Sequence, residues 1–422
     1  MNVEAYLETF EQRTKDPSLN AMIFLMKKFG DPHKKVKTIH IAGTNGKGSV
    51  CEMLSNILMK AGYKTAKFMS PYLLKFNERL VINDREIASE DTEKILEKMK
   101  IYIDEYNEKN EIKVKWFEVI TSLAYIYYAE QKCDFAVIEA GMGGTWDCTN
   151  IIEPEISVIT KIGYDHIDLL GDTIEKIARN KAGIIKENSN TVFVDQENII
   201  EIIKEVCNKK NNKLHLINSN NISNYEYNID FGKFDYKKYK NIKINLQGKA
   251  QTLNASECLE CVDILREKGY KISEEAVREG LSTVVHKGRL EILSKSPLII
   301  FDGGHNEDAI INLRENVEAY YKNFENKKYI VSLLKTKDYK TIIKNLCKNN
   351  DGTFIFTNGI DNEKYVSNED LYNEAKKYIE ENKIFKEELD KAIKEIKNKD
   401  VATFIVGSFY VYKKTRELLE NV

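Results

Sequence analysis

The sequence lacks the features of a membrane protein or of a disulfide-stabilised secreted protein. No apolar stretch approaches the length needed to cross a bilayer, and no segment resembles a secretory signal peptide. The seven cysteines are an odd number, which favours free thiols in a reducing environment over a disulfide framework. We therefore expect a cytoplasmic protein.

An excess of charge of one sign is also missing. The 64 basic and 66 acidic residues leave a net charge of −2, which gives no indication of a nucleic-acid or membrane partner. Only five prolines are present, so no proline-rich linker marks a domain boundary. A chain of 422 residues nevertheless exceeds what one hydrophobic core usually serves, and we expect two domains.

Two of the cysteines have the spacing of a metal-binding pair. Cys258 and Cys261 are separated by two residues, but they lie in an apolar helical pattern without a second Cys or His pair nearby. The pattern favours buried thiols over zinc ligands.

The most informative stretch is GTNGKGS, residues 43–49. It follows an apolar run at 38–42 that predicts a buried strand, and it precedes a helical pattern of apolar residues that Gly62 closes. The glycines allow backbone amides to face an anion, Lys47 adds a point charge, and the Ser49 hydroxyl can bind Mg²⁺. An ordinary glycine turn capping a helix is the alternative, but a nucleoside triphosphate site explains all of these residues together.

The first half of the chain alternates between predicted strands and helices, which favours a parallel sheet covered by helices on both faces. We expect strands at 64–68, 135–138 and 156–160, and helices at 2–29, 89–107 and 116–131. Glu139 ends one of these strands, and Asp165 and His166 follow another. Ligands of such sheets bind at this edge.

A helix predicted from about Asp172 contains an anomaly. Its apolar face includes Ile177 and Ala178, and Lys181 falls on the same face. Burial of an ammonium group is costly and favours the neutral amine. The alternative is a lysine whose stem crosses the apolar face while its charge reaches solvent.

The second half of the chain has a different pattern of polar and apolar residues. Residues 213–248 alternate polar and apolar side chains, which predicts a β-rich insertion of hairpins. A helix at 251–265 follows, and strands at 298–301, 329–333, 353–356 and 402–406 predict a smaller α/β domain. We place the domain boundary near residue 287, which gives domains at 1–287 and 288–422.

Five motifs together resemble the folylpolyglutamate synthase and dihydrofolate synthase family of the Mur ligases, which are ATP-dependent enzymes that join an amino acid to a carboxylate. The motifs are GTNGKGS (43–49), SPYL (70–73), EAGMGGTWDCTN (139–150), DHIDLLGDTIEKIARNKAGIIK (165–186) and DGGHN (302–306). The similarity runs from about residue 18 to GSFYVYKKTRE at 407–417. It implies a P-loop-containing parallel-sheet ATPase domain of Mur ligase type followed by a smaller Rossmann-like α/β domain.

The resemblance also implies site residues. The catalytic residues would be Lys47, Glu139, His166, Lys181 and His305, and Lys181 would be carbamylated. ATP would contact Gly43, Thr44, Asn45, Gly46, Lys47, Gly48, Ser49, Asn254, Arg289 and Asp302. Mg²⁺ would be held by Ser49, Ser70, Glu139 and His166, and the folate by Ser70, Pro71, Tyr72, Thr145, Trp146 and Asp147. Taken without the family, Asn254, Arg289 and His305 are equally explained as a helix-surface, a linker and a turn residue.

Some positions depart from the family pattern. Thr145 stands where an arginine is usual, and Trp146 is bulkier than the usual residue. Ala250 replaces a common histidine, and His286–Lys287 replaces a Trp-Pro pair. The changes near residue 145 affect the expected folate side, so they leave the choice of folate substrate open.

The resemblance implies that ATP, with Mg²⁺, activates a carboxylate as an acyl phosphate and that the amine of L-glutamate attacks it. We expect a monomer that acts on small molecules, a reduced folate or dihydropteroate, and that binds neither nucleic acid nor membrane. The alternatives are a different Mur-type amide ligase and a non-catalytic nucleotide-binding regulator. The regulator requires only the glycine loop and leaves Glu139, His166 and Lys181 unexplained.

Overall fold

The structure, a computed structural model, describes residues 3–11, 18–396 and 399–420. Contacts divide these residues into two units. The first unit runs to Ser223 and also includes Asp235–Ile242 and Leu253–Val284. The second unit comprises Asn224–Phe234, Lys243–Thr252 and the described residues from Val285 onward. No helix within the described ranges combines the length and the apolar character that a membrane span requires.

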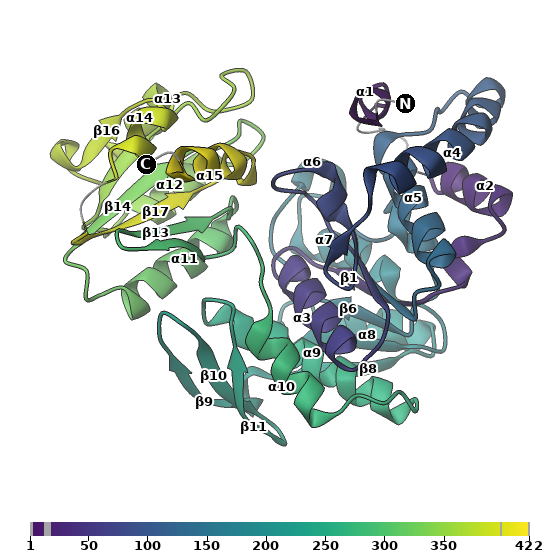
Figure 1. Ribbon diagram of the computed structural model, residues 1–422. Coiled ribbons are helices and arrows are strands. Elements are labelled where there is room, and N and C mark those ends of the chain that lie inside the picture. Colours follow the sequence, from purple (N-terminus) through teal and green to yellow (C-terminus); the bar gives the residue numbers. More distant parts are fainter. Residues whose placement is uncertain (1–2, 12–17, 397–398, 421–422) are drawn as a thin grey trace. The chain divides into compact units, whose positions relative to one another are not determined.

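The first unit is built on one sheet with helices on both faces (Figure 1). Its strands are β1 (Lys37–Ala42), β2 (Thr65–Phe68), β3 (Leu80–Ile82), β4 (Arg85–Glu86), β5 (Phe135–Glu139), β6 (Ile156–Ile159), β7 (Asn190–Val194) and β8 (Lys213–Ile217). Its helices are α1 (Val3–Glu8), α2 (Asn20–Lys28), α3 (Lys47–Lys60), α4 (Ser89–Lys109), α5 (Trp116–Glu130), α6 (Ile167–Leu170), α7 (Ile174–Lys181), α8 (Ile200–Lys209), α9 (Ala250–Glu267) and α10 (Glu274–Thr283).

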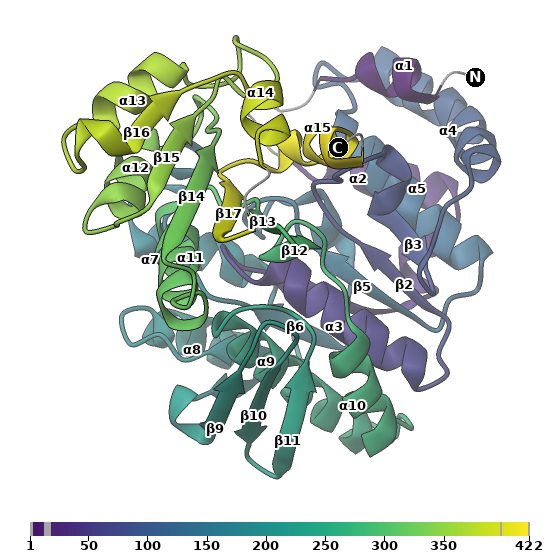
Figure 2. The same ribbon diagram turned by 60° about the vertical axis from the view of Figure 1, so that its left-hand side comes forward.

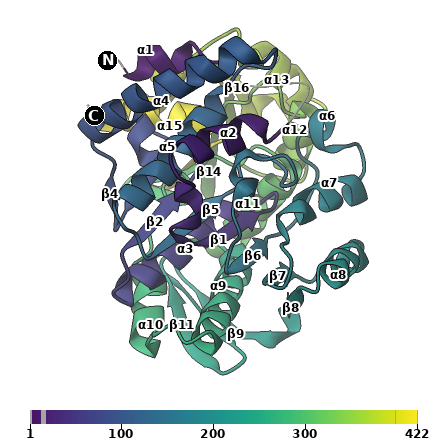
Figure 3. The same ribbon diagram turned by 90° about the vertical axis from the view of Figure 1, so that its right-hand side faces the viewer.

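The strand order is β4-β3-β2-β5-β1-β6-β7-β8, and the pairs from β2 to β8 are all parallel. In the register, His40 of β1 lies beside Ile138 of β5 and Ser157 of β6, so these residues share one face. On that face α2, α4 and α5 pack over β2 and β5, as Figure 3 shows, and α7 and α8 pack over β6 and β7. The opposite face carries α3, which contacts β1, β2 and β5.

The hairpin region contains a short separate sheet. It comprises β9 (Ile222–Tyr227), β10 (Gly232–Tyr236) and β11 (Tyr239–Ile244), which are adjacent in chain order. The predicted insertion at 213–248 is therefore too long at its start, because 213–217 form β8 and pair in parallel with β7. The alternation of polar and apolar residues in β8 belongs to an edge strand of the main sheet.

The second unit has a six-stranded sheet in the order β12-β13-β17-β14-β15-β16, and Figure 2 shows β14, β15 and β16 side by side. The strands are β12 (Glu291–Lys295), β13 (Leu298–Asp302), β14 (Asn326–Val331), β15 (Thr353–Phe356), β16 (Ile384–Lys386) and β17 (Val401–Val406). The helices are α11 (Glu307–Tyr320), α12 (Tyr339–Cys347), α13 (Asn368–Ala375), α14 (Leu389–Lys394) and α15 (Tyr412–Glu420). Within the described residues, β12 and β13 form the antiparallel pair of this sheet, and the other four strand pairs are parallel.

The expected fold class, a parallel α/β domain followed by a smaller α/β domain, is confirmed. The expected single helix at 2–29 is wrong, because α1 ends at Glu8 and α2 begins only at Asn20. The described residues between these helices, 9–11 and 18–19, are not helical, and the part of the predicted helix at 12–17 lies outside the described residues. The domain boundary near residue 287 remains a prediction.

Helix α9 is buried on nearly all sides, and it carries an acidic side chain into the core. Glu257 has no exposed surface, and neither of its carboxyl oxygens has a hydrogen-bond partner among the residues that the structure describes. Burial raises the pKa of Glu257 well above its ordinary value of 4.5, so the folded protein holds it as the neutral acid. Cys258 and Cys261 are also fully buried on this helix, as expected for core thiols.

We predict that Glu257→Leu stabilises the protein at neutral pH by about 1–3 kcal/mol, because the change removes a buried polar group without a partner. The pKa of Glu257 is higher in the folded than in the unfolded state. Its contribution to the free energy of unfolding is therefore fully present below about pH 4.5 and is lost as the pH rises through the folded pKa. The advantage of the leucine variant should therefore grow with pH. Urea unfolding of both proteins between pH 4.5 and pH 8 measures it.

Glu260→Leu is the matched control on the same helix. Glu260 accepts a hydrogen bond from the Tyr236 hydroxyl at 2.9 Å and pairs with Lys237. Its removal leaves these groups without their partner, so this variant should be less stable than the wild type. A Glu257→Leu protein that is also destabilised at pH 8 would contradict the prediction.

Candidate functional site

Three adjacent strands deliver the predicted catalytic residues of the first unit to one edge of the sheet. β5, β1 and β6 are parallel neighbours, and the register places Ile41 beside both Glu139 and Val158. The glycine loop follows β1, Glu139 ends β5, and the segment leading to His166 follows β6. Because parallel strands end at the same edge, these three segments converge there.

The glycine loop fits closely against its neighbours at two positions. A Cβ atom on Gly43 would lie 1.8 Å from the Thr160 hydroxyl oxygen, and one on Gly46 would lie 2.5 Å from Oδ1 of Asn254. Gly46 also has a φ of +98°, a conformation that other residues rarely adopt. The structure thus places Asn254, from α9, directly beside the loop.

The first part of the loop is tied to the segment after β6. The amides of Thr44 and Asn45 donate to the Lys161 carbonyl at 3.0 and 3.2 Å. The Thr44 hydroxyl donates to the Gly163 carbonyl at 2.9 Å and accepts from the Gly163 amide at 3.0 Å. These two amides therefore hold the loop in place in this structure.

The second part of the loop is the start of α3, which begins at Lys47. First-turn amides of a helix have no carbonyl of their own helix to donate to, so they attract an anion. Ser49 lies in this turn and is buried. The Lys47 ammonium donates to the carbonyls of Gly43 and Thr44 at 3.1 and 3.2 Å, so it lies folded over the loop.

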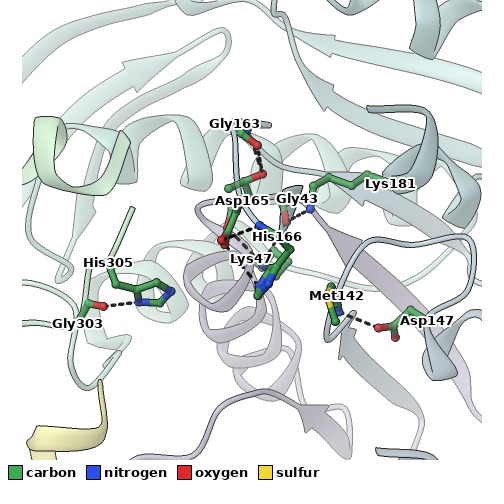
Figure 4. Close-up of polar contacts among 11 residues, drawn as sticks. Gly43, Lys47, Met142, Asp147, Gly163, Asp165, His166, Lys181, Gly303 and His305 are labelled. Atoms are coloured by element: carbon green, nitrogen blue, oxygen red, sulfur yellow. Dashed lines mark hydrogen bonds and ion pairs between the residues drawn. The ribbon is translucent and has the colours of Figure 1, made fainter. Parts of the chain in front are cut away.

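Lys181, the last residue of α7, is buried, and its ammonium donates to the Gly43 carbonyl at 2.6 Å (Figure 4). Burial, with a smaller contribution from the charge of Lys47, lowers the pKa of Lys181 to about 7, and the charges of Asp165 and Asp147 oppose this shift. Its charge does not reach solvent, which excludes the alternative of a lysine that extends to the surface. The side chain thus has a substantial neutral fraction near pH 7.

Glu139 and Ser70 are brought together. Glu139 is buried, and its Oε2 accepts a hydrogen bond from the Ser70 amide at 3.1 Å. A carboxylate beside a serine hydroxyl is a donor set that suits Mg²⁺, which usually takes one or two carboxylates and completes its shell with phosphate and water oxygens. Within residues 3–11, 18–396 and 399–420, no three His, Cys, Asp or Glu side chains form a metal-binding group. Substrate and water oxygens would have to complete the shell.

His166 lies at the turn before α6. Its φ of +51° is left-handed, a strained conformation for a residue with a side chain and one that is concentrated at functional sites. Its amide donates to Asp165 Oδ1 at 3.0 Å, and its Nε2 lies 3.7 Å from Asp165 Oδ2. The predicted partner Asp165 is therefore in place beside it.

The loop after β5 packs on the end of α7. The Gly144 amide donates to Asn180 Oδ1 at 3.0 Å, and the Thr145 amide and hydroxyl both donate to the Asn180 carbonyl at 2.9 Å. A Cβ on Gly144 would lie 2.7 Å from the Lys181 carbonyl oxygen, so no larger residue fits there without displacing the backbone. The threonine at 145 thus ties this loop to the helix that carries Lys181.

A buried chain of polar groups fixes the far end of the same loop. Asp147 accepts from the Met142 amide at 2.8 Å (Figure 4) and from the Thr149 hydroxyl at 2.5 Å. The Thr149 oxygen lies 2.8 Å from Nε2 of His40. Because the hydroxyl hydrogen is used on Asp147, the imidazole donates through Nε2. Burial lowers the pKa of His40 to about 3, with a smaller contribution from the charge of Lys186, so the ring is neutral.

The remaining predicted folate residues differ in exposure. Trp146 is 54% exposed and Tyr72 is 40% exposed, whereas Asp147 is only 6% exposed. Pro71 is also exposed, and it follows Ser70 through a cis peptide bond. Two aromatic side chains are thus open to solvent on the loops that follow β2 and β5.

Three predicted residues belong to the second unit and lie together there. Asp302 ends β13, and its two oxygens accept from the amides of Gly304 and Leu290 at 2.7 and 2.9 Å. Burial raises the pKa of Asp302, while the charge of Arg289 opposes this shift. His305 Nδ1 donates to the Gly303 carbonyl at 2.8 Å (Figure 4).

Sequence reasoning did not select four residues that shape these sites: His40, Thr149, Asn180 and Phe409. Three of them lie inside segments that had been recognised, since Thr149 belongs to 139–150, Asn180 to 165–186 and Phe409 to 407–417. The buried position of His40 within an apolar strand was a further signal, because a buried histidine needs a partner.

Comparisons with known proteins show which sequences and structures the chain is similar to. The family model of the Mur ligase middle domain matches residues 41–262, and that of the dihydrofolate synthetase C-terminal domain matches residues 289–418. The chain is 34% identical over 415 residues to a dihydrofolate synthase/folylpolyglutamate synthase of Bacillus subtilis, covering 96% of this chain and 95% of the relative.

Solved structures are similar over nearly the whole chain. A folylpolyglutamate synthase of Thermotoga maritima superposes with a TM-score of 0.85 at 31% identity, covering 99% of this chain and 96% of that one. Escherichia coli FolC in complex with DHPP and ADP superposes with a TM-score of 0.84 at 25% identity, covering 99% and 96%.

We predict that Gly46→Ala weakens the binding of a nucleoside triphosphate at least tenfold, because the new Cβ would displace the Asn254 side chain at the loop. The left-handed backbone would also cost about 1–2 kcal/mol of stability. Gly62→Ala at the other end of α3 is the control, since its φ is +90° and nothing lies within 4 Å of its Cβ. It should lose similar stability but bind nucleotide normally in isothermal titration calorimetry. Equal affinities of the two variants would refute the prediction.

Proposed function

The chain belongs to the dihydrofolate synthase/folylpolyglutamate synthase family of Mur ligases, and from this membership we propose that it adds L-glutamate to the γ-carboxylate of a reduced folate. The reaction consumes ATP and releases ADP and phosphate. Formation of dihydrofolate from dihydropteroate and glutamate is a second reaction that the same residues can serve.

One observation carries the proposal. The glycine loop, Glu139 and the segment of His166 follow three adjacent parallel strands, so a phosphate cradle, a carboxylate and an imidazole are delivered to one edge. A regulator that only binds nucleotide has no need of the buried Glu139 or of Lys181 against the loop. Amide synthesis needs both positioning and charge neutralisation.

The proposed reaction has two steps. A carboxylate oxygen of the acceptor attacks the γ-phosphorus of ATP, which gives an acyl phosphate and ADP. The amine of glutamate then attacks the acyl carbon, the C–O bond to phosphate breaks, and the amine loses a proton as the amide forms. The protein supplies no nucleophile, and its residues align the groups and balance their charge.

The start of α3 and Lys47 would hold the phosphates. The ammonium of Lys47 now donates to two loop carbonyls, and it would exchange them for phosphate oxygens. Thr44, Asn45 and Gly46 shape the loop, and Asn254 lies against Gly46. Gly43, Gly48 and Ser49 complete this part of the nucleotide site. Arg289 and Asp302 are the proposed contacts from the second unit.

Mg²⁺ fits the residues present. The buried carboxylate of Glu139 lies against the Ser70 amide, and the Ser49 and Ser70 hydroxyls with His166 complete the proposed set. When bound, the ion would neutralise phosphate charge and polarise the phosphoryl group. Glu139 and Ser70 are held in advance by their mutual hydrogen bond, so little reorganisation is needed to receive it.

Lys181 is proposed to react with CO₂. The neutral amine adds to the carbon of CO₂ and loses a proton, which gives a carbamate. The lowered pKa of about 7 supplies the neutral amine, and the product exchanges a buried cation for an anion near the metal residues. His305 is proposed to act near the phosphate or the incoming glutamate.

For the folate we propose two kinds of contribution. Tyr72 and Trp146 offer exposed aromatic surface on which a flat ring can stack, together with Ser70 and Pro71. Thr145 and Asp147 are engaged with other groups of the protein, so we propose that they act through the conformation of the loop. The enzyme is proposed to be a cytoplasmic monomer. The free, mostly buried cysteines support the cytoplasmic location, because free thiols are typical of a reducing compartment.

We predict that the purified protein releases ADP only when L-glutamate and a pteroyl substrate are both present. Tetrahydrofolate and dihydropteroate are tested in parallel, and mass spectrometry of the products identifies each added glutamate. Glu139→Gln should reduce turnover at least a hundredfold, because it removes the carboxylate charge from the metal residues. Nucleotide binding without glutamate-dependent turnover would instead identify a regulator.

We also predict a carbamate on Lys181. After equilibration with ¹³C-bicarbonate near pH 8, the protein should give one carbamate carbonyl signal in its ¹³C NMR spectrum. Lys181→Arg should abolish the signal, since a guanidinium stays protonated. Lys186→Arg is the control and should keep the signal: burial also lowers the pKa of Lys186, and its ammonium likewise donates to a carbonyl, that of Asn150 at 2.9 Å. A signal that survives Lys181→Arg would place the carbamate elsewhere.

A further inference from the structure

Phe409 occupies a central position among the proposed ligand-binding residues of the second unit. It begins a 3-10 helix (Phe409–Val411) directly after β17, and its side chain is buried. β17 pairs in parallel with β13, and the register places Val406 beside Asp302. The loop of Phe409 and the turn 302–305 therefore leave the same edge of the sheet as neighbours.

The ring contacts two of the ionisable groups of this edge, Arg289 and His305. The guanidinium carbon of Arg289 lies 4.4 Å from the centre of the Phe409 ring, and the His305 ring lies 6.0 Å from it at an angle of 78°. The first is a cation–π contact and the second an edge-to-face contact. A Cβ on Gly303 would lie 2.2 Å from the ring, so Phe409 also closes tightly on the turn between Asp302 and His305.

The backbone around Arg289 is fixed on both sides. The Leu290 amide donates to Asp302 Oδ2 at 2.9 Å, and the Gly288 carbonyl accepts from the Gly303 amide at 2.9 Å. Glu291 holds the Gly288 amide at 2.6 Å. The arginine side chain has several rotatable bonds, so a contact at its charged end restricts the conformations that it can adopt.

A π-face provides such a contact without using hydrogen-bond donors. The five N–H groups of a guanidinium lie in its plane, and an aromatic ring attracts the charge through its face. The contact with the face of Phe409 therefore uses none of these N–H groups itself. A carboxylate in the place of the ring would partly neutralise the same charge.

We propose that Phe409 is a positioning residue that orients Arg289 for nucleotide binding and holds the turn that carries His305. This inference rests on the proposed contact of Arg289 with ATP. It assigns the role to a residue whose side chain touches no substrate in the proposed reaction.

The test is a double-mutant cycle between Phe409→Leu and Arg289→Ala, read as the affinity for a non-hydrolysable ATP analogue in calorimetry. Phe409→Leu should weaken binding about three- to thirtyfold, which is the range of a cation–π contact. In the Arg289→Ala protein the same change should cost less than twofold, because its partner is gone. Phe409→Tyr keeps the π-face and should bind within twofold of the wild type. Equal losses in both backgrounds would overturn the inference.

Phe404→Leu separates positioning from general destabilisation. Phe404 is fully buried in β17 and packs on Tyr329 and Tyr321. The Phe404→Leu change should lower the thermal midpoint of unfolding at least as much as Phe409→Leu does, but it should leave the nucleotide affinity unchanged. If it weakens binding equally, Phe409 is only structural. The cycle measures binding and does not depend on turnover. A wild-type protein without glutamate-dependent turnover would therefore refute the ligase proposal, and the cycle would still test the role of Phe409.

Discussion

The parallel pairing of β1 between β5 and β6 is the constraint on which the first unit depends. It brings the glycine loop, Glu139 and the segment of His166 to one edge, although the loop and His166 lie more than a hundred positions apart in the sequence. The register also fixes the faces. A slip of β1 by one residue would move His40 to the face of α3 and away from Thr149. The loop after β5 would then lose the buried chain that holds it.

The charges at this edge are arranged to receive an anion. Lys47 and Lys181 both donate to the Gly43 carbonyl, and the charge of Lys47 contributes to the lowered pKa of Lys181. Two ammonium groups near one carbonyl repel each other, and burial strengthens the repulsion because the local dielectric constant is low. Phosphate oxygens would relieve it. Conversion of Lys181 to an anion would relieve it as well, so nucleotide binding and the proposed modification address the same unfavourable charge.

Local patterns in the sequence predict local structure well. The run 38–42, the loop and the helix after it were predictable because each is decided by residues near in sequence. The apolar pattern at 2–29 predicted one helix although the sequence contains a proline there. This prediction was wrong, because α1 ends at Glu8 and α2 begins at Asn20. The strand 213–217 was assigned to the insertion because alternation cannot show which sheet a strand joins.

The site was predictable only where a motif names its residues. The pairing of His40 with Thr149 joins positions 109 residues apart, and neither spacing nor composition indicates it. Phe409 meets Arg289 only because β17 lies beside β13, which is a fact of topology. Periodicity does not contain this information. It enters only when the order of the strands is known.

In the loops after β5 and β17, an uncharged side chain that was not predicted from the sequence holds an ionisable one. Thr149 donates its hydroxyl to Asp147, with neutral His40 behind it, and Phe409 offers its ring face to Arg289. A buried ion pair in either place would pay a desolvation cost and would cancel part of the local charge. A hydroxyl or a π-face fixes the geometry and leaves the net charge unchanged. For a protein that has to meet phosphates and carboxylates, rigid support without neutralisation keeps the electrostatic attraction available for the ligand.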